Sequence, residues 1–483
     1  MKKIIKIFFL LIFLICNLWV LTNYIGHKIT YISFSLLSLI YLFYMFRPKS
    51  IFFDNFLGLF LFLGLWLNFS LKIKLKSIFP KGVQDFKYWF SDGVGSFDFS
   101  ADSIDKVLFI CMIAYSSIML SSLIRQNFFI YKENIIKKFE KKFYIKNKIF
   151  ILTSFFSLIF IFSLINFNFK IYQRGIVNDY GIFINSLFTF LFFVLFPSIT
   201  TFIINYESHT NKSLKISIVT SIIEAFLNSY SILSRNFIFN PLSNLFGIYK
   251  LNKITNNFKH TKFLYFLVLI IFFFLISVTL VSKERNEFLI KKTDKLNEKI
   301  VNDKKFNSID NAIISFSNRI FKIFVSRLIG VEGIMSVSSS KELNFKLFYY
   351  ALNEKYVRGE NSFYDKFKNE NRTSKACKKN NLEKINCNIN SISLMGIIAF
   401  LFYSGSFLFL FFGLMIVCLF CSFFEYLCYR VSNNMVFSAF VSQIFAYRLW
   451  HFGYLPANTY KLVLSICILI ILTYLYKKII SKL

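Results

Sequence analysis

The longest apolar runs of this chain decide what it can fold into. The stretch "FLYFLVLIIFFFLISVTLV" covers residues 263–281 without a charged side chain. A helix needs about 20 apolar residues to cross the hydrocarbon core of a bilayer. Similar runs recur along the 483 residues, of which 56% are hydrophobic and 68 are Phe. Because these runs are too long for the short periods of a soluble core, the sequence predicts an all-α, polytopic transmembrane helix bundle.

The strong positive charge does not indicate a nucleic-acid partner. The formal net charge is +32, but the lysines lie between the apolar runs, where basic residues set membrane topology. A nucleic-acid site would instead need a water-exposed basic groove with stacking aromatics. The start, "MKKIIKIFFLLIFLICNLWV", has the charged head and apolar run of a signal peptide. No small-x-small cleavage site follows, so we expect a retained first span.

About twelve spans give the most consistent topology. They are expected at residues 7–22, 30–46, 51–70, 105–124, 149–166, 183–205, 216–233, 236–249, 263–281, 394–428, 434–450 and 459–476. The weakest is 236–249, which is short and contains Pro241. Including it puts both termini and every short basic loop on one side, which the positive-inside rule makes the cytoplasm. The remaining loops then face the opposite side of the membrane.

This topology divides the chain into three parts. An N-terminal bundle of about nine spans covers 1–281, a large periplasmic loop covers 282–393, and about three spans follow in 394–483. The loop is longer than a connection requires, and loops of that length are usually functional or disordered. Within it, "DNAIISFSNRIFKIFVSRL" places polar side chains on one helical face and apolar ones on another. That pattern predicts an amphipathic helix on the outer membrane surface.

The loop segment "FVSRLIGVEGIMSVSSSKE" contains the first candidate site. We expect it to continue the surface helix, with Gly330 and Gly333 letting the backbone turn. Arg327 and Glu332 at a membrane interface indicate an anionic ligand and a proton acceptor. The alternative is that the two residues form a structural ion pair or face water.

Further polar candidates fall on the same predicted side. Arg174, Arg235 and Arg448 lie in outer loops, turns or helix ends, and His451 follows Arg448 closely. Arg235 could instead snorkel to the interface, and Arg448 could be an anchor beside neighbouring aromatics. Glu224 lies within a span, where ionisable groups are costly and often functional. Its alternative is pairing with a Ser or Tyr inside the bundle.

Metal and cofactor chemistry is not indicated. The sequence has no HExxH, Walker or GxSxG motif and no Cys/His metal set, so we expect no cofactor and no metal. Cys418 and Cys421 lie inside an apolar run and indicate core packing. Cys377 and Cys387 are ten residues apart in the outer loop. In an oxidising periplasm this spacing predicts a disulfide.

The order of these parts resembles the O-antigen polymerase and O-antigen ligase superfamily of bacterial envelopes. The resemblance is carried by "YQRG", the turn "LSRNF" and the stretch "LMGIIAFLFYSGSFLFLFFGLM" after the large loop. It implies glycan transfer from undecaprenyl pyrophosphate carriers to an acceptor sugar, without metal, at the periplasmic face of the inner membrane. By position, Arg174, Arg235 and Arg327 would be the functional arginines. The ligase subgroup has a histidine in the large loop and this chain has none there, which favours a polymerase.

The sequence therefore predicts a polymerase of lipid-linked repeat units acting by inverting glycosyl transfer. Arg174, Arg235, Arg327 and Arg448 would hold the pyrophosphate, Glu332 would act as base, and His451 is the second choice for the base. The expected partners are the undecaprenyl-pyrophosphate-linked glycan and membrane lipid, with a chain-length regulator as a further candidate.

Two alternatives remain open. A different polyprenyl-dependent glycosyltransferase would usually carry an acidic motif in the first outer loop, and "NYIGHK" has none. A flippase or transporter of lipid-linked glycans would predict related halves and a charged central cavity. The chain has no internal repeat, and Glu224 is the one charge that stands out well inside a predicted span.

Overall fold

The chain is helical throughout the part that its computed structural model describes. The described residues are 2–78, 94, 97–129, 138–173, 180–210, 214–254, 260–294, 330–340, 342–354, 363, 395–450 and 456–480. Every regular element among them is an α-, 3₁₀- or π-helix, and no strand occurs there. The predicted all-α class is therefore confirmed.

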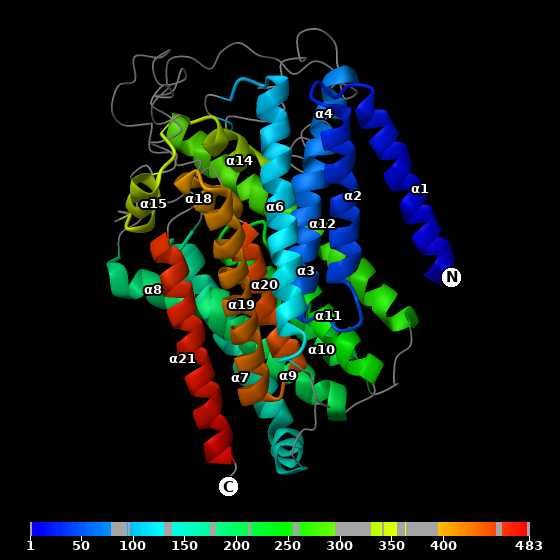
Figure 1. Ribbon diagram of the computed structural model, residues 1–483. Coiled ribbons are helices and arrows are strands. Elements are labelled where there is room, and N and C mark those ends of the chain that lie inside the picture. The colour runs from blue at the N-terminus through cyan, green and yellow to red at the C-terminus, as the bar shows by residue number, and fades with distance from the viewer. Residues whose placement is uncertain are drawn as a thin grey trace, which may run out of the picture. The chain divides into compact units, whose positions relative to one another are not determined.

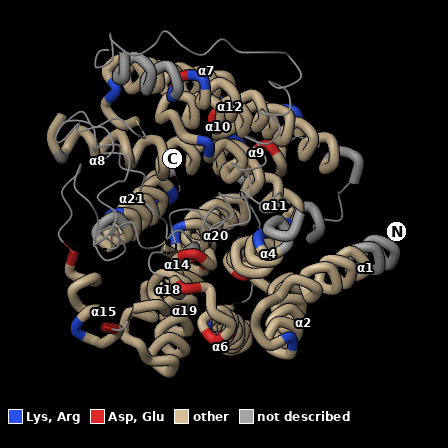
Figure 2. Tube along the Cα trace, turned by 90° about the horizontal axis from the view of Figure 1, so that it is seen from above, with Lys and Arg blue, Asp and Glu red and all other residues tan. Residues whose placement is uncertain are grey.

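Long apolar helices make the chain a multi-pass membrane protein. Within the described residues, eight helical stretches are long and apolar enough to cross a membrane: Lys28–Met45, Phe52–Ile73, Ala101–Arg125, Glu140–Phe169, Phe183–Thr210, Phe263–Arg285, Phe407–Ser432 and Thr459–Ile479. Their outward side chains are large and apolar; Ile149 is 79% exposed and Leu408 is 72% exposed. Such a surface suits lipid rather than water. Most of each helix is neither acidic nor basic (Figure 2).

The chain forms two compact units. Unit 1 comprises Met1–Phe129, Ser308–Ser422 and Phe445–Lys461, and unit 2 comprises Ile130–Asn307, Phe423–Ile444 and Leu462–Leu483. Three late helices, α19 (Phe407–Ser432), α20 (Met435–Trp450) and α21 (Pro456–Ile480), each contribute to both units. The predicted division at 281 and 393 remains a prediction.

Unit 1 is built around three helical stretches that run side by side (Figure 1). Besides parts of α19, α20 and α21, unit 1 contains α1 (Lys2–Leu21), α2 (Lys28–Met45), α3 (Phe52–Leu61), η1 (Phe62–Leu67), α4 (Asn68–Ile78), α6 (Ala101–Arg125), α14 (Val331–Ser338), α15 (Phe345–Leu352), α18 (Ile397–Leu401) and η4 (Phe402–Ser404). The three stretches that run side by side are α2, α6 and the continuous stretch α3–η1–α4. α2 packs on α6 and on the stretch α3–η1–α4. Helix α6 begins where the Ser100 side chain accepts a hydrogen bond from the Ser103 N–H at 3.3 Å. This is the N-cap arrangement that satisfies an orphan donor of the first turn.

The third span of unit 1 contains a π-helical turn. η1, "FLGLWL", lies between α3 and α4 without breaking the stretch. A π-turn accommodates one extra residue and frees backbone carbonyls, and such turns often occur at functional sites. The Leu61 carbonyl accepts a hydrogen bond from the Tyr115 hydroxyl at 3.3 Å. The polar residues Asn68 and Lys72 follow directly on α4.

The predicted span at 394–428 is wrong in its first part. The chain forms the short helix α18 and the 3₁₀ turn η4, then turns at Gly405 before α19 begins at Phe407. Gly405 has φ +70, a left-handed conformation that glycine adopts without steric cost. Hydropathy alone missed the break because the residues on both sides of it are apolar.

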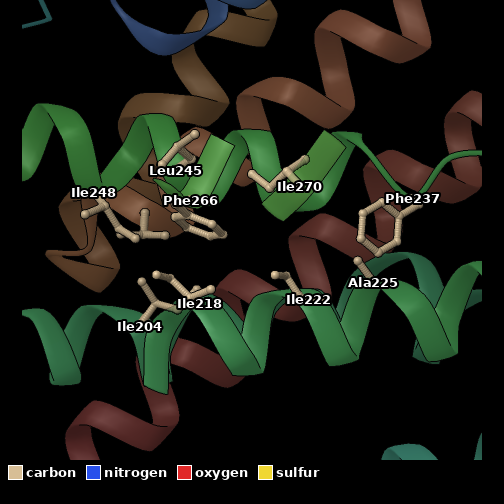
Figure 3. Packing of buried hydrophobic residues seen from close by; sticks show 10 residues of the cluster. Ile204, Ile218, Ile222, Ala225, Phe237, Leu245, Ile248, Phe266 and Ile270 are labelled. Atoms are coloured by element: carbon tan, nitrogen blue, oxygen red, sulfur yellow. The ribbon is translucent and has the colours of Figure 1, made fainter. Parts of the chain in front are cut away.

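Unit 2 has α10 at its centre. Its other elements are α7 (Lys138–Phe169), α8 (Ile182–Phe190), the π-helix η3 (Leu191–Leu195), α9 (Phe196–Thr210), α11 (Phe239–Ile254) and α12 (His260–Asp294), and α10 itself covers Lys215–Ser231. α10 packs against α7, α9, α11 and α12. One of its faces is apolar: Ile218, Ile222 and Ala225 meet Leu245 of α11 and Phe266 of α12 (Figure 3).

Candidate functional site

Helix α14 is a buried element of unit 1 and not a surface helix. All eight of its residues are buried, and it packs on α6, α18 and η4. Gly333 was predicted to let the backbone turn, but it lies in the middle of the helix. A Cβ at Gly333 would overlap the carbonyl group of Met395, and one at Gly330 would lie 3.0 Å from the backbone of Gly64. Both glycines therefore serve close packing.

Glu332 forms a buried ion pair on this helix. Its carboxylate pairs with the Lys72 ammonium of α4, and both side chains are almost completely buried. The Asn68 amide, one turn before Lys72, is 3.4 Å from each carboxylate oxygen. The Gly330 N–H donates to Oε2 at 3.4 Å. Within the described part of the chain, the polar partners of Glu332 are thus Lys72, Asn68 and the start of its own helix.

Lys72 and Glu332 compensate each other's charge in their buried environment. A buried charge is tolerated when it is paired and hydrogen-bonded, and Glu332 has both an ammonium and amide donors. Its predicted role as a proton acceptor requires that a substrate hydroxyl take the place of Lys72 at the carboxylate. The described contacts of Glu332 are those of an ion pair with Lys72, a partner that was not predicted; the predicted alternative, an ion pair with Arg327, involves a residue outside the described ones.

The end of unit 1 where α6 begins carries a second acidic group. Lys106 on α6 donates to the carbonyl of Ser338 at 3.2 Å, which fastens α14 to this end of the helix. The neighbouring Asp105 accepts from the Tyr24 hydroxyl at 2.5 Å and from the His27 N–H at 2.9 Å. His27 Nδ1 lies 3.0 Å from the same carboxylate. Polar side chains from α4, α6, α14 and the turn before α2 therefore gather at this end of unit 1.

A separate charged cluster lies at the other end of α6. Arg125 is 19 residues from Lys106 (125 − 106), which is about 28 Å along an α-helix. It pairs with Asp54 of α3 and donates to Ser422 Oγ at 2.5 Å. Arg47 donates to Ser122 Oγ at 3.0 Å, and that hydroxyl donates to Asp54 at 2.9 Å. This cluster is distinct from the one around Glu332.

Two of the predicted arginines lie in different units. Arg235 is half-buried in the turn between α10 and α11 of unit 2, where Leu233 has φ +50 and the Ser234 N–H donates to the Ser229 carbonyl at 2.8 Å. Arg448 of unit 1 donates from Nε to Thr459 Oγ1 at 3.2 Å. Their roles as pyrophosphate ligands remain predictions.

Five predicted residues lie outside the described residues. They are Arg174, Arg327, His451, Cys377 and Cys387. The predicted amphipathic helix before Leu328 also lies outside them. The base role of His451, the anion role of the two arginines and the disulfide therefore remain predictions.

Sequence reasoning missed several buried charges and amides. Asp54 lay within a predicted span, and Lys72 lay just beyond the predicted end of that span, yet neither was singled out. The usable signal was a charged residue inside or at the edge of an apolar run. Arg125, directly after the predicted span 105–124, gave the same signal, whereas Asn68 is an uncharged amide inside the predicted span 51–70. Asp54 is a further charge inside a predicted span, three residues from its start, whereas Glu224 lies near the middle of its own.

Glu224 itself has amide partners. It accepts hydrogen bonds from Asn228 at 3.1 Å and from Asn240 at 3.3 Å, whereas the sequence had offered Ser or Tyr as partners.

The comparisons with known proteins add no assignment. No protein-family model, curated protein sequence or solved structure matches the chain.

Proposed function

We propose that this chain is a membrane glycosyltransferase that polymerises undecaprenyl-pyrophosphate-linked oligosaccharide units at the periplasmic face of the bacterial inner membrane. The observation that supports the proposal most is the position of Glu332. This carboxylate follows Arg327 by five residues in the sequence and is held among polar side chains at one end of unit 1. A carboxylate at a bundle end, with an arginine five positions before it in the sequence, suits a reaction at a charged lipid headgroup.

The proposed reaction is a displacement at the anomeric carbon of the lipid-linked sugar. A hydroxyl oxygen of the acceptor forms the new bond to that carbon, and the bond to the pyrophosphate oxygen breaks. The leaving diphosphate gains charge, which arginine side chains neutralise through paired hydrogen bonds. Arg174, Arg235, Arg327 and Arg448 are proposed for this role. The hydroxyl proton passes to Glu332, which exchanges Lys72 for the acceptor, or to His451.

The test of function is a deletion strain complemented with variants. The deletion is expected to leave single repeat units in place of long polysaccharide. Replacing Arg174, Arg235 or Arg327 by Ala should also remove polymer at unchanged protein level, because the lost contacts are strongest in the transition state. Lys should rescue poorly, since an ammonium lacks the planar fork.

Arg430 provides the matched control. It is an exposed arginine in the last turn of α19 whose guanidinium lies 5.7 Å from the Tyr426 ring centroid. Arg430→Ala should leave polymer length unchanged. Normal polymer from Arg327→Ala at wild-type protein level would contradict the pyrophosphate role and would leave Arg327 as a membrane-surface residue.

The proposal includes twelve spans with both termini in the cytoplasm. The short helix α11, which contains Pro241, must then cross the membrane to reverse the chain before α12. A reporter fused after Lys262 should report cytoplasm, and one fused near Lys304 should report periplasm. If both reporters were on the same side of the membrane, the twelve-span topology would be wrong.

A transporter of lipid-linked glycans is the second candidate. The buried charges Asp54, Lys72, Arg125, Glu224 and Glu332 favour it, since charges inside a membrane bundle often line a transport pathway. The two functions differ in where the single units accumulate. Loss of a polymerase leaves them on the periplasmic side, whereas loss of a flippase leaves them in the cytoplasmic leaflet.

A further inference from the structure

The polar face of α10 is the feature of unit 2 that the proposed glycan transfer does not use. Ser217, Ser221, Glu224 and Asn228 follow one another at spacings of four, three and four residues, so they form one stripe along the helix. All four are buried. Because α10 is surrounded by α7, α9, α11 and α12, the stripe lies inside unit 2.

Glu224 is completely buried, and its hydrogen-bond donors are neutral. Asn228 Nδ2 donates to Oε1 at 3.1 Å, and Asn240 Nδ2 lies 3.3 Å from Oε1 and 3.5 Å from Oε2. Asn228 is fixed in turn, because its Nδ2 also donates to the Phe192 carbonyl of the π-helix η3 at 2.5 Å. No ion pair involves Glu224 within the described residues.

Another buried carboxylate of unit 2 provides the contrast. Glu207 on α9 lies 2.6 Å from the Lys148 ammonium and accepts from the Tyr144 hydroxyl at 2.8 Å. Glu207 therefore has a cation from its own chain. Since burying an unpaired charge is expensive, Glu224 needs a positive charge from elsewhere.

The polar groups around Glu224 present oxygen atoms with unused lone pairs. Asn244 donates from Nδ2 to Ser221 Oγ at 2.9 Å, which places its amide beside the stripe. The side-chain amide oxygens of Asn228 and Asn244 and the hydroxyl of Ser217 are buried and have no hydrogen-bond partner in the described part of the chain. Amide, hydroxyl and carboxylate oxygens are the ligands that hard cations prefer.

We propose that Glu224 binds a monovalent cation, sodium, together with the side-chain amide oxygen of Asn244 and the hydroxyl oxygen of Ser221. One carboxylate neutralises one positive charge, whereas a divalent ion would leave a buried surplus. A proton would supply a single hydrogen bond, but a cation can coordinate several oxygens at once. This inference is independent of the proposed glycan transfer.

The test measures sodium binding to the purified full-length chain in detergent or nanodiscs. The thermal unfolding midpoint is followed while NaCl replaces choline chloride at constant ionic strength, because a ligand that binds only the folded state raises stability with its concentration. We expect a saturable rise in NaCl, and saturable ²²Na⁺ binding at matching concentrations. In Glu224→Gln both responses should disappear.

Matched variants separate sodium binding from a folding defect. Glu207→Gln removes a buried carboxylate of the same unit that already has Lys148, so it should retain the wild-type sodium response. Asn244→Ala keeps Glu224 but removes one oxygen ligand, so it should bind sodium several-fold more weakly. The proposal is overturned if the wild-type midpoint and ²²Na⁺ counts are unchanged by sodium, if only pH moves the midpoint, or if Glu224→Gln folds and still binds sodium.

Discussion

Glu332 in unit 1 and Glu224 in unit 2 are both buried carboxylates, but their environments differ in one respect. Glu332 faces the Lys72 ammonium, whereas Glu224 faces the neutral amides of Asn228 and Asn240. The first site is close to electrically complete within the chain. The second has hydrogen-bond donors but no cation among the described residues. Similar burial therefore occurs with two kinds of compensation: a carboxylate paired with a cation of its own chain, and a carboxylate that can accept a cation from outside.

The largest expected effect comes from removing the cation in unit 1. Lys72→Met should destabilise the protein by about 3–5 kcal/mol, because it leaves Glu332 buried without its ion-pair partner. The free energy of unfolding, measured by denaturant titration in detergent micelles, tests this. The double variant Lys72→Met/Glu332→Leu should recover most of the loss. A double variant as unstable as the single one would show that the pair is not what Lys72 contributes.

The same substitution in both units gives the sharpest comparison. Glu332→Gln leaves Lys72 buried without its carboxylate and should cost about 3 kcal/mol. Glu224→Gln replaces one hydrogen-bonding group by another among neutral amides and should cost less than about 1 kcal/mol in choline buffer without sodium. Equal losses in the two units would remove the distinction between charged and neutral compensation.

The close packing of each unit predicts a smaller effect. A Cβ at Gly333 would overlap the Met395 carbonyl, and one at Gly247 of unit 2 would lie 2.8 Å from the Val436 Cα. Each Gly→Ala change should cost about 1–3 kcal/mol, since a fixed backbone cannot move aside cheaply. Gly333→Ala should also weaken the Lys72–Glu332 coupling, which Gly247→Ala should leave intact. Thermal midpoints and the coupling energy measure this.

Gly413 is the control for these two changes. Its Cβ position lies 3.3 Å from a Leu401 methyl group, and a flexible side-chain end can shift. Gly413→Ala should therefore be neutral or slightly stabilising, because Ala favours a helix by about 1 kcal/mol over Gly. A loss as large as that of Gly333→Ala would argue against the packing explanation.

The smallest effect is expected at an exposed carboxylate before α6. The Ser100 N–H and then the Ser103 side chain lower the pKa of Asp98 from its usual range. Since the folded pKa is the lower one, Asp98 stabilises the protein above its unfolded pKa, and this contribution falls away as the pH drops toward the folded pKa. Asp98→Asn should cost less than about 0.5 kcal/mol at pH 7, because the group is exposed. The difference from wild type should shrink below pH 4; an unchanged difference would exclude Asp98 titration as its origin.

The helical fold could be predicted from the sequence because apolarity is a local property. A run such as 263–281 specifies a membrane helix whatever its neighbours are, and α12 covers that run. The break at Gly405 could not be predicted in this way, since one glycine among apolar residues does not change mean hydropathy. The number of helices that cross the membrane also depends on short elements such as α11, whose composition is ambiguous.

The candidate site was predictable in part. Glu332 stood out because a charge interrupted an apolar pattern, but the ion pair considered from the sequence was with Arg327 and not with Lys72. Its partner Lys72 is 260 positions earlier (332 − 72), and no local pattern records which charges meet across such a separation. The role of Gly333 depends equally on where Met395 lies. A single sequence therefore indicated which groups were unusual but not what they touch.

The π-turn η1 changes the direction in which the side chains after it point, relative to those before it. Lys72 follows Asp54 by 18 residues (72 − 54), which is about five full turns at 3.6 residues per turn. In an unbroken α-helix the two side chains would point in the same direction. The extra residue of η1 rotates everything after it by about 100°, so Asp54 meets Arg125 of α6 whereas Lys72 meets Glu332 of α14. Deleting one residue within 62–67 should restore regular α-helical pitch and leave Lys72 facing its carboxylate, because the π-turn accommodates one extra residue. Straightening η1 without a deletion would instead turn Lys72 away from Glu332.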